Sequence, residues 1–140
     1  MNATDVKTAA SIEIEHLTPV LIVDAVEPCV RFWADRLGFN IENEVPGLDG
    51  VLVFASVKRG GVEVMYQTRA SVLADAPDAE ADLRGHSTAL FITVKNLDAI
   101  EQAMTGAAVV KPRHTTFYGT VEFYVKEPGG NTVGFAQRVS

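Results

Sequence analysis

At residues 57–61 the chain reads Val-Lys-Arg-Gly-Gly, and a short apolar segment that ends at Gln67 follows. About 70 residues later a related phrase, Val-Lys-Glu-Pro-Gly-Gly, occupies residues 125–130 and is followed by Gln137. A unit of this length that occurs twice indicates duplication of a supersecondary structure, because a solenoid needs several copies to bury its core. We therefore expect two similar modules in tandem.

The first half of the chain predicts a strand, a helix and then three strands. A β-branched apolar run opens the half, and Pro28 suits the first turn of the helix that follows. Gly38 ends this helix, and Gly- and Pro-containing turns separate the later segments. The predicted elements are a strand at 17–23, a helix at 27–37 and strands at 39–45, 51–58 and 62–67.

The second half repeats this order after a polar linker at 68–85 that is rich in Ala and Asp. Asn96 or Asp98 can cap a helix that Gly106 ends. Strands are predicted at 88–94, 107–111, 121–126 and 132–138. The sequence thus predicts an α+β fold of two βαβββ modules, with module one at 17–67, module two at 86–138, one domain over 12–140 and a mobile tail at 1–11.

Composition limits the classes of function. The chain has 140 residues, of which 47% are hydrophobic and 21% charged, so it suits one globular domain. A net charge of -6 argues against a nucleic-acid partner, because phosphate binding draws on a basic surface. The N-terminal residues are polar and lack an apolar core, so we expect neither a signal peptide nor a membrane anchor, and a cytoplasmic location.

Cys29 is the single cysteine of the chain. An intrachain disulfide and a cysteine-based zinc site are therefore excluded. No His or Asp pattern surrounds this thiol, so we interpret it as a buried, unreactive side chain.

Three stretches of the sequence carry a family resemblance. They are Phe32-Trp33 with Arg36-Leu37-Gly38-Phe39, Phe117-Tyr118-Gly119 with Glu122-Phe123, and Glu127-Pro128-Gly129-Gly130-Asn131. These stretches resemble the vicinal oxygen chelate superfamily, which includes glyoxalase I, bleomycin-resistance proteins and extradiol dioxygenases. With the order of elements they cover nearly all of residues 17–137. The resemblance implies that the eight strands form a curled mixed sheet, or cup, with the helices on its outer face, and that the protein is a homodimer.

The resemblance also assigns four positions that hold a divalent metal ion in the metalloenzymes of the family. Here they are Thr18, Glu63, Ala89 and Gly134, and among them Glu63 alone can donate to a metal. Zinc, nickel or iron is normally held by at least three His or carboxylate ligands, so no metal cofactor is predicted. The alternative is a divalent metal bound through Glu63 and His86, which requires a three-residue shift of the second module. We otherwise interpret His86 as a solvated loop residue.

Histidines elsewhere in the chain give no further metal motif. His16 precedes the first strand, and His114 lies in a polar connection. No two histidines stand at a metal-ligand spacing such as His-x-x-x-His.

Candidate ligand-binding residues come from both modules. Strand alternation places Glu63, Met65 and Gln67 on one face, which looks into the cup if the helices cover the other face. Glu63 either faces a ligand or is an edge-strand charge in solvent. Tyr118 and Glu122 fall where the family lines its ligand, although a structural tyrosine is an alternative. Trp33 either packs the helix onto the sheet or stacks on a ligand. The predicted ligand-binding residues are Glu63, Met65, Gln67, Tyr118, Glu122 and Trp33.

The leading functional hypothesis is a binding module of the bleomycin-resistance kind, which holds a small organic molecule in a concave groove without a metal. The alternative is a divalent-metal-dependent enzyme of the glyoxalase or dioxygenase type, acting as a lyase, isomerase or oxygenase. A third hypothesis is metal-free proton transfer with Glu63 or Glu122 as the base. The sequence names no ligand and leaves catalytic activity open.

Overall fold

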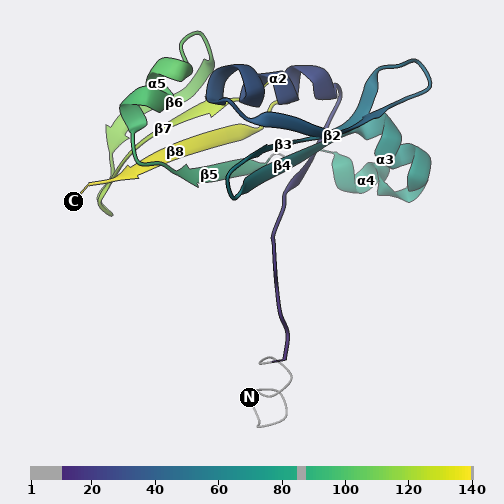
Figure 1. Cartoon of the computed structure of the whole chain (residues 1–140), viewed down its shortest axis with the longest axis horizontal. Coiled ribbons are helices and arrows are strands. Elements are labelled where there is room, and N and C mark those ends of the chain that lie inside the picture. The colour runs from purple at the N-terminus through teal and green to yellow at the C-terminus, as the bar shows by residue number, and fades with distance from the viewer. Residues whose placement is uncertain (1–10, 85–87, 140) are drawn as a thin grey trace.

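The computed structural model describes residues 11–84 and 88–139, which form two modules side by side (Figure 1). Module one contains β1 (Val20–Val23), α2 (Val26–Leu37), β2 (Asn40–Pro46), β3 (Leu52–Arg59) and β4 (Val62–Thr68). Module two contains β5 (Ala89–Thr93), α5 (Leu97–Ala103), β6 (Ala108–Thr115), β7 (Thr120–Lys126) and β8 (Thr132–Arg138). The predicted tandem βαβββ order is confirmed. No helix in the described ranges is long and apolar enough to cross a membrane.

Each module forms a four-stranded mixed sheet with the same topology. The strand orders are β1-β4-β3-β2 and β5-β8-β7-β6. The first strand of each module pairs with the last in parallel, and the remaining pairs are antiparallel. The eight strands therefore form two sheets that are not closed into a barrel, which agrees with the predicted curled sheet.

The helices α2 and α5 lie on the same side of the two sheets (Figure 1). Gly38 ends α2 with a φ of 69°, and Asn96 caps α5 by accepting a hydrogen bond from the Ala99 N–H at 3.2 Å. Along β4, Val64 and Tyr66 are buried on the helix side, and the intervening residues point the other way. We call the side of each sheet that faces away from α2 and α5 its open face.

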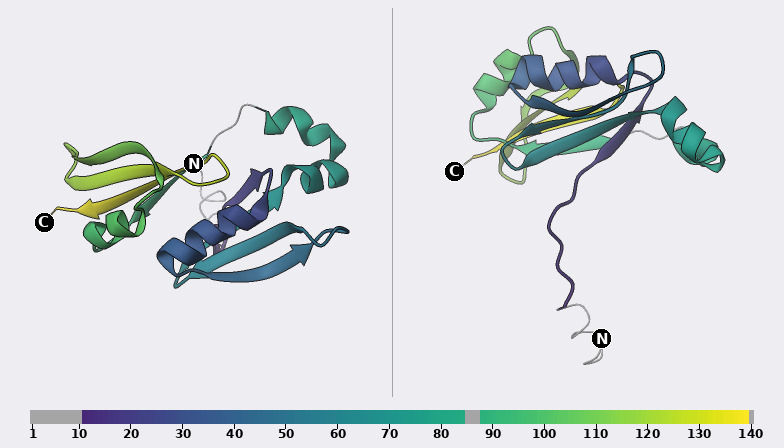
Figure 2. Two further views of the ribbon diagram at one scale, coloured as in Figure 1. Left: turned by 90° about the horizontal axis from the view of Figure 1, so that it is seen from above. Right: turned by 45° about the vertical axis from the view of Figure 1, so that its right-hand side comes forward.

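The linker between the modules is helical where the sequence predicted only a polar connection. It forms α3 (Arg69–Asp75), a 3-10 turn (Pro77–Ala79) and α4 (Glu80–Leu83), beside module one (Figure 2). The Thr68 hydroxyl caps α3 by accepting a hydrogen bond from the Ser71 N–H at 3.1 Å. Alanine favours the helix intrinsically, and this cap supplies the start that the composition alone did not reveal.

The N-terminal segment from residue 11 extends away from the sheets (Figures 1 and 2). The strand that was predicted from Leu17 begins only at Val20, and the Leu17 side chain is 90% exposed. Pro19 has no N–H to donate, although its carbonyl accepts from Met65 N at 2.9 Å. The predicted mobile tail, residues 1–11, lies outside the described residues except for Ser11.

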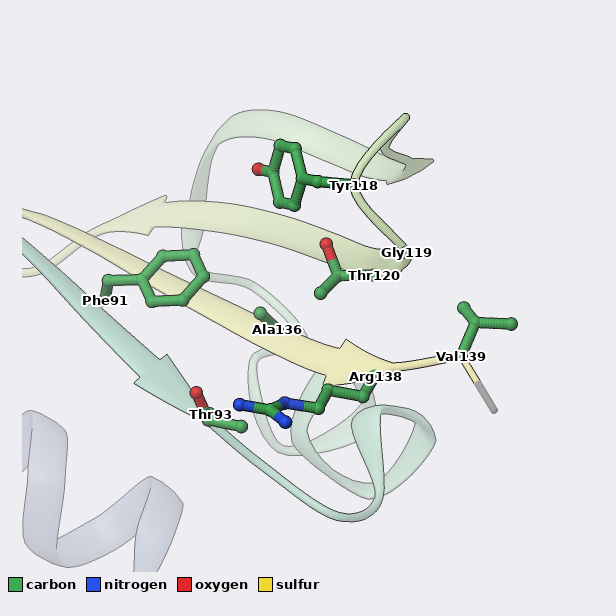
Figure 3. Close-up of a pocket in the computed structure, with 8 residues that line it drawn as sticks. All are labelled: Phe91, Thr93, Tyr118, Gly119, Thr120, Ala136, Arg138 and Val139. Atoms are coloured by element: carbon green, nitrogen blue, oxygen red, sulfur yellow. The ribbon is translucent and has the colours of Figure 1, made fainter.

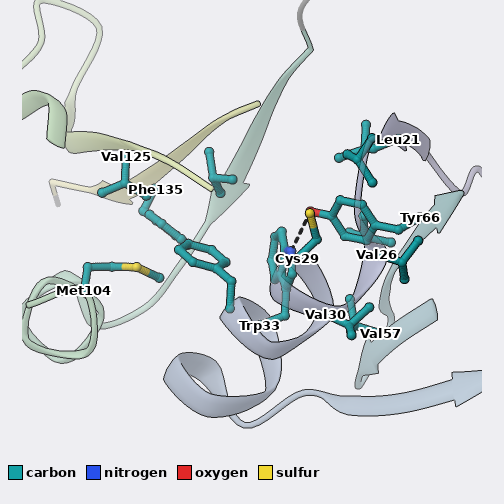
Figure 4. Packing of buried hydrophobic residues seen from close by; sticks show 14 of the residues in the cluster. Leu21, Val26, Cys29, Val30, Trp33, Val57, Tyr66, Met104, Val125 and Phe135 are labelled. Atoms are coloured by element: carbon teal, nitrogen blue, oxygen red, sulfur yellow. Dashed lines mark hydrogen bonds between the residues drawn. The ribbon is translucent and has the colours of Figure 1, made fainter. Parts of the chain in front are cut away.

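A buried hydrogen-bonded chain joins the modules, and Figure 4 shows its first link, from Trp33 to Tyr66. The Trp33 indole N–H donates to the Tyr66 hydroxyl at 2.9 Å, and that hydroxyl donates to the Glu127 carboxylate at 2.8 Å. Cys29 lies beside this chain, and burial together with the nearby Glu127 charge raises the pKa of its thiol. The thiol is therefore protonated at neutral pH, as expected of an unreactive cysteine.

Candidate functional site

The open face of module one carries the three predicted residues of β4. Glu63, Met65 and Gln67 are all half-buried, and they alternate with the core residues as expected. The edge-strand interpretation of Glu63 is wrong, because β4 lies between β1 and β3. Glu63 pairs in register with Lys58, and within the described ranges no hydrogen bond or ion pair to its carboxylate is found. Gln67 Nε2 donates to the Ser71 hydroxyl at 3.2 Å.

The open face of module two holds a carboxylate surrounded by hydroxyl groups. Glu122 is only 1% exposed. Its Oε2 accepts a hydrogen bond from the Thr120 hydroxyl at 2.6 Å, and its Oε1 accepts one from the Tyr124 hydroxyl at 2.6 Å. Tyr118 lies beside this carboxylate. The structure therefore brings the predicted pair Tyr118 and Glu122 together.

The environment of Glu122 favours its ionised form. Desolvation alone would raise the pKa of Glu122, but the hydroxyl donors and the nearby His114 outweigh it and hold this pKa below its ordinary value. The hydrogen bond to Glu122 raises the pKa of Tyr124 to about 12, and it also raises the pKa of Tyr118. Glu122 is thus an anion under neutral tyrosines at pH 7. A carboxylate that binds protons this weakly is a poor general base.

Two cavities flank Tyr118 on this face, and residues of module two line both. The first has a volume of about 450 Å³ and is lined by Phe91, Tyr118, Thr120 and Arg138 among others (Figure 3). The second, of about 550 Å³, is lined by Tyr118, Glu122, His114 and Tyr124 among others. Phe91 is 57% exposed and Tyr118 is 56% exposed. This face therefore offers aromatic surface beside a carboxylate and a guanidinium group.

Sequence reasoning missed four residues of this face. Phe91 follows from the alternation of β5, whose neighbours Leu90 and Ile92 pack against the core. His114 was expected in a loop, but β6 extends to Thr115, so His114 pairs with Glu122 in register. Its ring stacks on Tyr124, with centroids 6.1 Å apart. Tyr124 and Arg138 alternate with core residues of β7 and β8 in the same way.

Trp33 does not belong to either open face. It lies on α2, is fully buried and contacts Phe32 and Phe39 edge to face. The packing interpretation fits this position, and a side chain without exposed surface has no means of stacking on a ligand.

Comparisons with known proteins agree with this fold. A family model described as the Glyoxalase/Bleomycin resistance protein/Dioxygenase superfamily matches residues 13–135. The chain belongs to this superfamily. No curated protein matches the sequence.

Solved structures of other superfamily members superpose on most of the chain. TioX from Micromonospora sp. ML1 is 20% identical with a TM-score of 0.72, covering 89% of this chain and 99% of TioX. TnmS3, an antibiotic binding protein from Streptomyces sp. CB03234, is 19% identical with a TM-score of 0.64, covering 91% and 98%. Lactoylglutathione lyase from Agrobacterium tumefaciens is 15% identical with a TM-score of 0.67, covering 90% and 95%. At these identities the likeness shows the fold.

The four metal positions implied for this superfamily member do not form a ligand set. The backbone at Gly134 lies under the Tyr124 ring, so that a Cβ there would clash with the ring. Strand register pairs Ala89 with Thr132 and not with Gly134. Across residues 11–84 and 88–139, no group of three His, Cys, Asp or Glu side chains is placed to hold a metal ion. His86, the alternative ligand, lies outside the described residues.

Proposed function

We propose that this superfamily member binds a planar aromatic molecule on the open face of module two, without a metal ion. The arrangement around Tyr118 carries the proposal. Its ring lines both cavities, and the ring of Phe91 lines the first. Both rings are exposed, and aromatic surface of this kind favours stacking with a flat ligand. Concave, partly apolar surface with a few fixed polar groups is typical of small-molecule sites.

The negative charge of Glu122, which lines the 550 Å³ cavity, favours a ligand with a cationic or hydrogen-bond-donating group there, whereas Arg138 lines the 450 Å³ cavity. Glu122 is ionised. Its hydroxyl partners donate hydrogen bonds to the carboxylate, but as neutral groups they do not cancel its negative charge. The net charge of -6 attracts the same ligands from solution. TnmS3, which shares the fold, is described as an antibiotic binding protein, and this supports a ligand of that general class.

A metal-free site is favoured by the strand register, which places Ala89 and Thr132 of module two side by side at the positions that correspond to Thr18 and Glu63. Neither Ala89 nor Thr132 carries the imidazole or carboxylate that a transition metal requires. The fold is shared with a lactoylglutathione lyase, so a divalent-metal-dependent enzyme is the alternative. We further propose a cytoplasmic homodimer, because β2 and β6 are edge strands that a second copy can pair with or cover. Sedimentation as a monomer at micromolar concentration would remove the homodimer.

The experiment is a calorimetric titration with proflavine, a planar aromatic cation, in the presence and absence of EDTA. We expect saturable binding that EDTA does not change and that 9-anthracenecarboxylate, a planar anion, does not reproduce. Tyr118→Ala and Phe91→Ala should each weaken binding about tenfold, or about 1.4 kcal/mol. Leu48→Ala, in the fully exposed turn of module one, is the control and should have no effect.

Two outcomes would decide for the metal-dependent alternative, and a third would contradict the proposed position of the ligand. Stoichiometric metal in the purified protein by elemental analysis, or loss of binding in EDTA, would establish a metal-dependent site. Equal affinity of the Tyr118→Ala and Leu48→Ala variants would place the ligand elsewhere.

A further inference from the structure

A third hollow lies at the junction of the modules, on a different side from the two open-face cavities. It has a volume of about 1140 Å³ and is bounded by the end of α2, the β3–β4 turn, β5 and α5. We call it the inter-module groove. It shares Thr93 with the 450 Å³ cavity, but its floor is made of helix-side residues. The apolar floor comprises Leu37, Phe39, Ile92, Val94, Ile100 and Phe135.

The charged residues that line the inter-module groove are all cationic. They are Arg36, Arg59 and Lys95, and the lining contains no Asp or Glu. Most of the other arginines in the described ranges form ion pairs with carboxylates, as Arg31 does with Asp35. Arg138, which lies on the open face of module two, is the exception among the described arginines. In a chain with a net charge of -6, two arginines without a carboxylate partner beside one apolar groove give it local positive potential.

Main-chain contacts fix both arginines at this place. Arg36 Nη1 donates to the carbonyls of Ala103 at 3.2 Å and Thr105 at 2.9 Å, at the end of α5. Arg59 Nη1 donates to the Leu37 carbonyl at 2.6 Å, at the end of α2. A Cβ on Gly38 would meet this nitrogen at 2.7 Å, so the glycine gives the guanidinium its room. These carbonyls orient the two groups without neutralising them.

We propose that the inter-module groove binds an amphipathic organic anion, whose apolar body lies on the floor while its carboxylate or sulfonate contacts Arg59 and Arg36. Guanidinium groups suit such oxyanions, because they donate two hydrogen bonds in one plane. The open face is expected to select cations, so the two sites differ in charge preference and in position. The groove is therefore a site additional to the one that carries the proposed function.

The single tryptophan of the chain reports on this groove. Trp33 contacts Phe39 at a centroid distance of 5.0 Å, and Phe39 lines the groove. A ligand that displaces water from Phe39 should change the emission of Trp33 without touching it.

The test titrates the full-length protein with decanoate, decanol and decylammonium, each below its micelle concentration, and follows Trp33 emission and heat. We expect saturable binding of decanoate, about tenfold weaker binding of decanol and no saturable binding of decylammonium. Arg36→Gln with Arg59→Gln should weaken decanoate to the level of decanol. Arg31→Gln, on the exposed surface of the same helix, is the matched control and should bind as the parent does.

Two further variants keep the test decisive if loss of the helix-end contacts unfolds the double variant. Ala99→Phe, at an exposed position of α5 that lines the groove, should block decanoate and decanol and leave proflavine binding intact. Lys95→Gln should weaken decanoate but not decanol. The proposal is overturned if decanoate shows no saturable binding, if decylammonium binds equally well, or if Ala99→Phe binds decanoate like the parent.

Discussion

The two modules share one topology but distribute bulk on their open faces in opposite ways. Val20 and Phe91 each stand six residues before the first residue of the following helix, so they occupy equivalent positions. In module one, Met65 lies between Val20 and Ser56 in the sheet. In module two, Gly134 lies between Phe91 and Tyr124. The large residue is thus on the central strand in one module and on its neighbours in the other.

This difference shows that the helix side and the open face obey different constraints. The helix side must fill a shared core, and both modules place apolar residues there, such as Tyr66 and Phe135. On the open face only the total side-chain volume has to be conserved, so a large side chain can stand on either of two neighbouring strands. Ligand positions therefore do not transfer between modules by counting: in register, the equivalent of Glu63 is Thr132, not Gly134.

The largest effect is expected from forcing the arrangement of module one onto module two. Gly134→Met introduces a side chain where even a Cβ would clash with the Tyr124 ring. Overpacking should lower the free energy of unfolding by roughly 3 kcal/mol, measured in urea. Adding Tyr124→Ser, which copies the Met65–Ser56 pair, should restore at least half of this loss. If the double variant is no more stable than Gly134→Met, the exchange of bulk is not what packs this face.

A somewhat smaller effect is expected where the modules meet. Tyr66→Phe removes the hydroxyl that accepts from Trp33 and donates to Glu127. Both buried groups then lose a partner, which should lower the free energy of unfolding by about 2 kcal/mol. Tyr118→Phe, which removes a hydroxyl from a half-exposed residue, is the control and should cost less than half as much. Equal losses in the two variants would show that the buried chain adds no stability.

A pH-dependent effect distinguishes the carboxylates of the two open faces. The pKa of Glu122 is lower in the folded protein than its ordinary value of 4.5, so its ionised form stabilises the fold above that pH. This stability is lost as the pH falls through the lower, folded pKa. Glu122→Gln should therefore melt below the parent at pH 7, and the gap should close towards pH 3. A gap that stays constant over this range would contradict the role of the charge.

Most of the fold could be predicted from the sequence, because its signals are local. The paired Gly turns, Gly38 after α2 and the alternation of β4 all predicted elements that the structure contains. The helices at 69–83 were missed, because their start depends on the Thr68 cap and not on an apolar stripe. β6 was predicted too short, because Pro112 and Arg113 look like a loop although they lie within a strand that has register shifts.

The candidate site could be predicted only in part. The family resemblance indicated that Tyr118 and Glu122 lie where the family lines its ligand, and the structure brings them together. The hydroxyl donors of Glu122 and the ring over Gly134 depend on cross-strand register, which β-bulges in β6 alter and a single sequence does not specify. Trp33 was included because an aromatic residue on a helix has the same pattern whether it packs or binds.

The smallest effect is expected from Glu63, the acidic residue on the open face of module one. Its carboxylate is half-buried, and across the described residues it has no hydrogen bond or ion pair, unlike Glu122 with its hydroxyl donors. A partly desolvated charge without a partner does not stabilise the fold. Glu63→Gln should therefore leave the melting temperature unchanged or raise it slightly, with a gain in the free energy of unfolding of at most about 0.5 kcal/mol. Thermal melts of Glu63→Gln and Glu122→Gln, recorded side by side at pH 7, check the contrast, because only the second should fall. A clear fall for Glu63→Gln would mean that a partner holds its carboxylate inside the folded protein, and this would make its role structural.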